Sequence, residues 1–228
     1  MCTTFAQATL PQRCVLCDGA SGAEQVCTAC DADLPYASPA RCPICAVPLP
    51  QTEICGECLR EPPAFDSAQA VFDYAYPIDG LLVAYKFSAQ LSLANLFAQK
   101  ILTRLDCETL PDVIVPMPLH PERLKQRGFN QALEIARGVA RQLSIPIDST
   151  SCERVRATPA QVGLTREERL KNMRGAFYCA GNFDGARIAI IDDVMTSGAS
   201  ANALSKTLRA LGAKEIHIWL VARTRRAD

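Results

Sequence analysis

Apolar and amphipathic segments alternate through the last two-thirds of the chain. Four runs rich in aliphatic and aromatic residues predict β-strands, at 67–76, 112–118, 188–192 and 215–222. Three stretches with apolar residues every three or four positions predict amphipathic helices, at 92–105, 130–143 and 200–212. Apolar strands that alternate with helices are typical of a parallel sheet covered on both faces. We therefore expect an α/β domain whose parallel sheet is flanked by helices.

The first 60 residues show a different pattern, with few large apolar side chains and four C-x-x-C pairs. The eight cysteines are Cys14, Cys17, Cys27, Cys30, Cys42, Cys45, Cys55 and Cys58. The interval between the first and second pairs equals that between the third and fourth, which indicates an internal repeat of one cysteine-containing unit. Two such pairs supply four thiolates, the ligand set of a tetrahedral structural zinc site. We predict two structural zinc ions, with sequential pairing of the cysteines preferred and a cross-braced pairing left open.

Metal is the better explanation for this cysteine-rich module, because it has too few apolar residues for a core. A structural zinc ion contributes about 10–16 kcal/mol in small peptides, enough to fold such a segment. Disulfides, redox-active pairs or an iron–sulfur cluster are the alternatives. EPPAF at 61–65 predicts a linker. We expect a double zinc-ribbon module over 1–63 and a larger domain over 64–228. The other cysteines are predicted to be small buried residues, namely Cys2, Cys107, Cys152 and Cys179.

Composition and charge narrow the class of protein. Of 228 residues, 49% are hydrophobic and 21% charged, as in soluble globular proteins. No apolar run approaches the ~18 residues of a membrane helix, no signal peptide is visible, and the C-x-x-C usage favours the cytoplasm. The 24 basic and 24 acidic residues are unevenly spread, since acidic residues are in excess before residue 67 and basic residues after it. A polyanionic partner is expected to meet the larger domain.

The strand at 188–192 leads into two adjacent carboxylates, Asp192 and Asp193, and then into a loop of small residues. A loop between a strand and a helix presents backbone N–H groups at the positive end of the helix dipole, which suits a phosphate. The loop residues are Thr196, Ser197, Gly198, Ala199 and Ser200. The two carboxylates can accept hydrogen bonds from a ribose diol and hold Mg²⁺ through water. This combination predicts a ribose 5-phosphate site.

IAIIDDVMTSGAS at 188–200 resembles the thirteen-residue phosphoribosyl pyrophosphate (PRPP) signature of type I phosphoribosyltransferases. Further segments narrow the resemblance, namely AYKF at 84–87, QRGFNQ at 126–131 and TREERLKNMRGAF at 165–177. With the four C-x-x-C pairs, this order is similar to the ComF family of competence-associated proteins over nearly the whole chain. The resemblance implies a type I phosphoribosyltransferase-like sheet and PRPP binding, with Asp192 and Asp193 as the catalytic candidates.

The resemblance also assigns roles by position. Met117, Pro118 and Leu119 take the place of the pyrophosphate loop, with Arg123, Lys125 and Arg127 nearby as sources of positive charge. Residues 153–175 resemble the loop that closes over PRPP, and Arg169 is its candidate contact. Lys86 is a candidate phosphate contact from the opposite wall.

Several functions remain open on the sequence alone. One is Mg²⁺-dependent phosphoribosyl transfer from PRPP to an unknown acceptor. Another, implied by the resemblance, is the uptake and handling of transforming single-stranded DNA in natural competence. A PRPP-sensing regulator without turnover and a nucleotide-salvage phosphoribosyltransferase are the alternatives. Without a Walker A motif, ATP-driven DNA translocation requires a partner, and the acidic zinc module is the expected docking surface for it.

Overall fold

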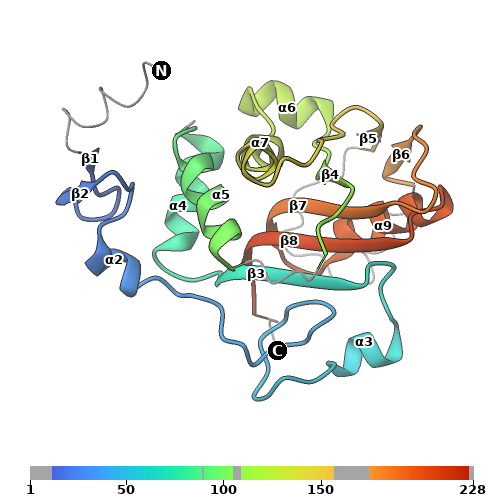
Figure 1. The fold of residues 1–228 in the computed structure, drawn as a ribbon, viewed down its shortest axis with the longest axis horizontal. Coiled ribbons are helices and arrows are strands. Elements are labelled where there is room, and N and C mark those ends of the chain that lie inside the picture. Colours follow the sequence, from blue (N-terminus) through green and yellow to red (C-terminus); the bar gives the residue numbers. More distant parts are fainter. Residues whose placement is uncertain (1–11, 89, 105–108, 157–174, 226–228) are drawn as a thin grey trace.

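Four parallel strands form the central sheet of the protein. The structure is a computed structural model that describes residues 12–88, 90–104, 109–156 and 175–225. The strands are β3 (Ser67–Asp73), β4 (Val113–Pro116), β7 (Arg187–Met195) and β8 (Glu215–Arg223). Their spatial order is β3-β8-β7-β4, and every neighbouring pair is parallel. The predicted fold class, a parallel sheet flanked by helices, is confirmed (Figure 1).

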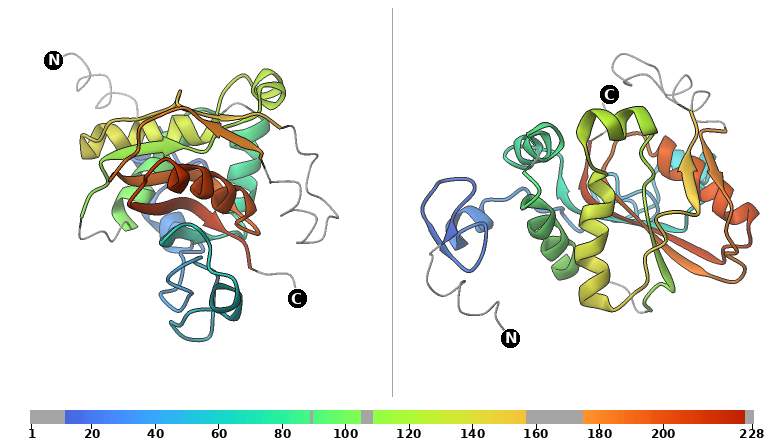
Figure 2. Two further views of the ribbon diagram at one scale, coloured as in Figure 1. Left: turned by 90° about the vertical axis from the view of Figure 1, so that its right-hand side faces the viewer. Right: turned by 90° about the horizontal axis from the view of Figure 1, so that it is seen from above.

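Helices cover both faces of this sheet, as the apolar strands require. One face packs against α4 (Ile78–Phe87), α5 (Leu93–Arg104) and α7 (Gln131–Leu143), and Ala189 and Ile191 of β7 point to it. The other face packs against α9 (Ala199–Ala210), and Ile188 and Ile190 point to it. Figure 2 shows α9 across the sheet from the other three helices. The strict alternation along β7 reflects the period of two of an extended strand.

Strand β7 is longer than its sequence predicts. The expected strand ended at Asp192, but the ladder with β8 continues to the pair of Met195 and Arg223. Asp192 and Asp193 therefore lie inside the strand rather than at its end. Helix α4 was not predicted, although Ile78, Leu81, Leu82 and Tyr85 have helical spacing and are buried.

The remaining short elements occur outside the central sheet. They are β1 (Gln12–Arg13), β2 (Ala20–Gly22), α2 (Thr28–Ala32), α3 (Gly56–Arg60), α6 (Pro121–Arg127), β5 (Cys152–Arg154) and β6 (Phe177–Cys179). β5 and β6 pair antiparallel, and the buried Cys152 and Cys179 face each other and form a disulfide, with Cα atoms 4.1 Å apart. Both cysteines are buried, as predicted, but the disulfide between them was not predicted. Cys2 and Cys107 lie outside the described residues.

Short segments pair with both outer strands of the sheet. Along β3, Ala37 donates to the Val71 carbonyl at 2.8 Å, and Asp73 donates to the Pro35 carbonyl at 2.9 Å. Along β4, Ile114 donates to the Pro146 carbonyl and its own carbonyl accepts from Asp148, both at 2.9 Å. These segments cover the end of β3 at Val71 to Asp73 and the middle of β4 at Ile114.

Helices α5 and α7 pack closely enough that one contact requires glycine. A Cβ atom at Gly138 would lie 2.6 Å from the Cβ of Ala98, whereas a Cβ at Gly80 in α4 would meet nothing within 4 Å. We expect Gly138→Ala to destabilise the protein by about 1–3 kcal/mol through overpacking. Gly80→Ala should instead stabilise it by about 0.5–1 kcal/mol, because alanine favours the helix. Urea unfolding measures both, and equal stability of Gly138→Ala and the unchanged protein would contradict the packing described here.

Candidate functional site

The eight cysteines of the N-terminal module form two clusters of four. One contains Cys14, Cys17, Cys27 and Cys30, and the other contains Cys42, Cys45, Cys55 and Cys58. In each, the four sulfur atoms lie within 4.8 Å of one another. Four thiolates around zinc at about 2.3 Å are about 3.8 Å apart in a tetrahedron. The Cys17 and Cys27 sulfurs are 3.8 Å apart and those of Cys45 and Cys55 are 3.7 Å apart. The clusters fit tetrahedral zinc and follow the sequential pairing.

The electrostatics of both clusters favour a bound cation. Burial raises the pKa of Cys14, but backbone hydrogen bonds from Cys27, Cys17 and Leu16 outweigh it and lower that pKa to about 6. In the second cluster, burial and then the negative charge of Cys45 raise the pKa of Cys58. Four thiols held this close cannot all ionise without a compensating positive charge. A zinc ion supplies that charge and fixes the four sulfurs.

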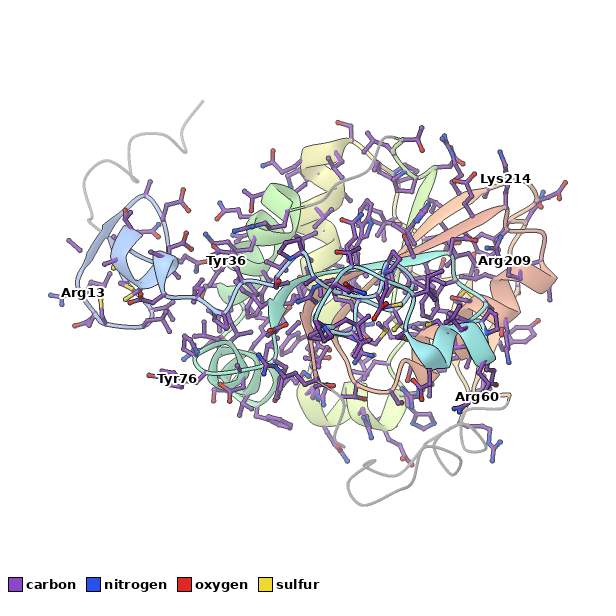
Figure 3. All side chains as sticks on the ribbon, turned by 90° about the horizontal axis from the view of Figure 1, so that it is seen from below. Arg13, Tyr36, Arg60, Tyr76, Arg209 and Lys214 are labelled. Atoms are coloured by element: carbon purple, nitrogen blue, oxygen red, sulfur yellow. A yellow bond between two sulfur atoms is a disulfide. The ribbon has the colours of Figure 1, made fainter. Side chains whose placement is uncertain are left out.

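The two clusters have different surroundings. Residues of the first belong to the module at one end of the molecule, where Cys17 is exposed and Asp31 pairs with Lys100 of α5 at 2.5 Å. All four cysteines of the second are buried, and they belong to the same core as α9 and one face of the sheet. Figure 3 labels Arg13 beside the first cluster and Arg60 at the end of α3 beside the second, far apart in the molecule.

The carboxylate pair lies in the second half of β7, just beyond the level at which the neighbouring strand β4 ends. Asp193 is 8% exposed, and its carboxylate pairs with the Lys86 ammonium at 2.5 Å. The Asp192 carboxylate accepts from the Asp193 amide at 2.9 Å, and the Asp193 carboxylate accepts from the Val194 amide at 2.8 Å. Burial, and then the charge of Asp193, raise the pKa of Asp192 well above its usual value. The pair therefore favours a nearby cation.

The loop after the carboxylates ends at the N-terminus of α9. Gly198 caps this helix with a φ of 77°, in the left-handed region that favours glycine. A Cβ there would lie 3.6 Å from the Met195 sulfur, so the backbone angle rather than space requires glycine. Helix α9 has 12 residues, and its dipole places partial positive charge at Ala199 and Ser200. Thr196 to Ser200 thus form a turn suited to an anion.

Basic side chains from two other elements approach the carboxylates. Lys86 comes from the last turn of α4 and Arg127 from the last turn of α6. The Arg127 guanidinium lies 5.3 Å from the centre of the Phe87 ring. Burial lowers the pKa of Arg127, and the charges of Asp193 and Asp192 partly offset this, which places all three groups in one electrostatic neighbourhood. Of the basic residues of α6, Arg123 is partly buried and Lys125 is exposed.

In the QRGFNQ segment (126–131), several residues stabilise the fold and one is a candidate for ligand binding. Gly128 ends α6 with a φ of 80°, and the Asn130 side chain caps α7 by accepting from the Ala132 and Leu133 amides. Phe129 packs 5.4 Å from the Tyr85 ring, and the Tyr85 hydroxyl donates to the Gln131 carbonyl at 2.9 Å. These contacts account for the Gly, Phe and Asn positions, and they leave Arg127 as the candidate for ligand binding.

The predicted pyrophosphate loop has one available donor among its three residues. The Met117 amide donates to the Ile191 carbonyl at 2.9 Å, and Pro118 has no N–H, which leaves the Leu119 amide. Pro118, Leu119 and His120 line a cavity of about 590 Å³ that Glu153 and Arg154 bound on another side. This volume lies within the usual range for small-molecule pockets. Arg169 lies outside the described residues, so its predicted role stays a prediction.

The fold and the two cysteine clusters define the class of protein. It is a parallel α/β protein with an N-terminal module that carries two tetracysteine sites. A family model described as "Double zinc ribbon domain" matches residues 5–59. The chain is 36% identical over 178 residues to "Competence protein F" of Haemophilus influenzae, covering 74% of this chain and 78% of that protein. It is 32% identical over 225 residues to "DNA utilization protein YhgH" of Escherichia coli K12, covering 95% and 99%. The chain therefore belongs to the ComF family.

A more distant relative is also named a competence protein. "Competence protein ComFC" of Bacillus subtilis is 26% identical over 198 residues, covering 83% of this chain and 80% of that protein. A solved purine phosphoribosyltransferase of Pyrococcus horikoshii is 21% identical with a TM-score of 0.34, covering 59% of this chain and 73% of that one. No described helix is long and apolar enough to cross a membrane.

The two cysteine clusters lead to a test of metal content. We expect purified protein to contain two zinc ions per chain, because each cluster provides four sulfur ligands at tetrahedral spacing. Elemental analysis measures the stoichiometry, and Cys58→Ser should lower it to about one, since three ligands hold zinc more weakly. Ser197→Ala serves as the matched control and should retain two. Disulfides among these eight cysteines, with less than one zinc per chain, would contradict the assignment.

Proposed function

We propose that the chain binds PRPP with Mg²⁺ at the edge formed by the carboxyl ends of β7 and β4. The observation that carries the proposal is the sequence of groups along one strand and turn: two adjacent carboxylates, then a left-handed glycine, then a helix N-terminus. Carboxylates suit the ribose diol, and the turn suits the 5-phosphate. The carboxylates and the turn are adjacent along the chain, which suits a ligand that carries a diol and a phosphate on one sugar.

In this proposal, the charged groups around the edge have separate tasks. Asp192 and Asp193 hold the ribose hydroxyls and would bind Mg²⁺, which offsets negative charge on the ligand's phosphates when bound. Lys86 neutralises Asp193, and this lowers the cost of keeping two carboxylates side by side. Arg127 and the Leu119 amide provide donors on the pyrophosphate side, next to the cavity between α6, α7 and β5.

The biological setting that we propose is the handling of single-stranded DNA in the cytoplasm. The support is family membership, since the relatives are named competence protein F and DNA utilization protein. The excess of basic residues after residue 66 agrees with a polyanionic partner.

Phosphoribosyl transfer to an acceptor and PRPP sensing without turnover share the same binding site. Detection of pyrophosphate after incubation with PRPP and Mg²⁺ distinguishes them. Docking of a translocation protein on the zinc module stays a prediction.

Asn substitutions at the carboxylate pair test PRPP binding. We expect Asp192→Asn with Asp193→Asn to weaken PRPP affinity roughly 100-fold or more, because each carboxylate contributes charge-assisted hydrogen bonds. Asparagine keeps the side-chain shape beside Lys86, so the fold should persist. Isothermal calorimetry with PRPP and Mg²⁺ measures the affinity, and circular dichroism checks the fold.

The matched control for this pair is Asp112→Asn. Asp112 directly precedes β4 and pairs at 3.0 Å with Arg187, the first residue of β7, so it tests an ion-paired carboxylate away from the proposed site. This variant should bind PRPP as the unchanged protein does. Normal PRPP affinity in the folded double variant would rule out the assignment of Asp192 and Asp193.

The basic residues of α6 test binding of single-stranded DNA. We expect Arg123→Gln, Lys125→Gln and Arg127→Gln together to weaken binding. The slope of log affinity against log salt should become shallower by about 2, because each lost phosphate contact releases about 0.7 fewer counterions. Fluorescence anisotropy over a salt series measures both quantities.

A control variant with the same change in net charge carries Arg141→Gln, Lys206→Gln and Lys214→Gln. These three residues are exposed and lie outside α6. Their replacement should change the salt slope much less. An equal loss in both triple variants would show that net charge, rather than α6, governs DNA binding.

A further inference from the structure

Arg223 is a buried charged residue for which the proposed ligand chemistry has no direct use. It is the last residue of β8, is 3% exposed, and pairs with Met195 of β7 in the ladder. Its guanidinium is surrounded by main-chain carbonyl groups. The Nε atom donates to the Cys45 carbonyl at 2.9 Å. The Nη1 atom donates to the Met195 carbonyl at 2.9 Å and also to the Thr196 carbonyl. One side chain thus connects the second cysteine cluster to the proposed phosphate loop.

These hydrogen bonds determine how the loop presents its amides. The peptide group is planar and trans, so a carbonyl and the following N–H point in opposite directions. Because Arg223 holds the Met195 and Thr196 carbonyls, the N–H groups of Thr196 and Ser197 must point away from it. A phosphate is bound by N–H groups turned outward in this manner. Arg223 therefore orients donors that it does not touch.

The Cys45 carbonyl that accepts from Arg223 belongs to a turn of the second cluster, and several hydrogen bonds hold this turn in place. The Cys42 amide donates to the Val47 carbonyl at 2.9 Å, and the Ala46 amide donates to the Cys42 carbonyl at 2.8 Å, which closes a tight turn around Cys45. Arg41 binds the Ala46 carbonyl at 2.9 Å and Asp73 at 2.8 Å. The turn is thus fastened to the end of β3 as well as to Arg223.

The cluster and the loop also face each other across a small space. Cys45 and Cys58 on one side, and Ser197, Gly198 and Ala199 on the other, line a cavity of about 40 Å³. The linker after the cluster is attached to α9, where the Ala64 amide donates to the Asn202 side chain at 2.8 Å. The second cluster and the N-terminal turn of α9 therefore pack as one unit.

We infer that zinc in the second cluster holds the 196–200 loop in its phosphate-binding conformation through Arg223. The inference rests on the proposed function, since it concerns how the same site is controlled. Metal fixes the Cys45 carbonyl, and the Cys45 carbonyl fixes Arg223. Arg223 in turn fixes the Thr196 carbonyl and, together with the Thr224 amide, the Met195 carbonyl. Loss of metal at this cluster therefore frees the Cys45 carbonyl, and Arg223 loses that fixed acceptor. Arg223 is accordingly a positioning residue for the ligand.

The first cluster is the natural control because it repeats the same ligands elsewhere. Its module is joined to α5 by the Asp31–Lys100 ion pair, and the residues around it belong to the core on the opposite face of the sheet. Loss of zinc there is expected to leave the loop unchanged. The two halves of one repeated sequence thus differ in their effect on the site.

Two variants disturb the link between the second cluster and the 196–200 loop, and two make comparable changes in the first module. Arg223→Lys retains the charge and all eight cysteines, but a single ammonium cannot reach both the Cys45 and the loop carbonyls. Cys58→Ser removes a ligand of the second cluster. The matched controls are Lys100→Gln and Cys17→Ser. Zinc analysis and circular dichroism establish metal content and fold for each protein.

Two measurements on the full chain read out the loop. Amide hydrogen exchange at residues 195–200 without ligand should be roughly tenfold faster in Arg223→Lys and Cys58→Ser, and unchanged in the controls. Affinity for ribose 5-phosphate should fall roughly tenfold in the same two variants. Affinity for pyrophosphate should stay the same, because its proposed donors lie on the α6 side.

Unchanged loop exchange in zinc-loaded Arg223→Lys overturns the inference, and so does equal acceleration in Cys17→Ser and Cys58→Ser. If Cys58→Ser does not fold, Arg223→Lys and Lys100→Gln still decide it. Failure of the unchanged protein to bind PRPP or ribose 5-phosphate refutes the proposed function alone, because hydrogen exchange requires no ligand. Normal ligand binding together with unchanged exchange in Arg223→Lys refutes the inference alone.

Discussion

The pairing of β7 with β8 up to Met195 and Arg223 is the constraint on which the rest of the site depends. It keeps β7 extended through two adjacent carboxylates that would otherwise repel each other into solvent. It also ends both strands at the same level, so the turn into α9 begins beside the last residue of β8. The carboxylates, the left-handed glycine and the helix N-terminus are all positioned by this one ladder.

Much of this arrangement could be predicted from the sequence, because its signals are local. Apolar runs define the strands, and Gly198 followed by a helical pattern defines the turn into α9. Helix α4 had an equally local signal, since Ile78, Leu81, Leu82 and Tyr85 repeat with helical spacing. Without this helix, the contact between Lys86 and Asp193 has no explanation, because the last turn of α4 carries the ammonium group to the carboxylate.

Other features have no local signal. The disulfide joins cysteines 27 residues apart, and only the pairing of β5 with β6 brings them together. Arg223 stands in a basic C-terminal stretch that resembles a solvated tail, and its partners are main-chain carbonyls, which leave no trace in residue types. The two cysteine units have the same spacing, yet one is partly exposed and the other is part of the core. Ligand spacing determines the metal geometry, but tertiary packing determines what the metal supports.

The segments that pair with the outer strands affect how this protein can associate with others. An unpaired edge strand is a template for strand addition by a peptide or a second copy, and it promotes aggregation. Here residues 35–37 occupy the outer side of β3, and residues 146–148 occupy that of β4. The connection between the two cysteine units thus protects one edge of the sheet, in addition to joining the units. Strand addition at the covered parts of these edges is blocked, and loosening residues 35–37 would expose the end of β3 to pairing with another chain.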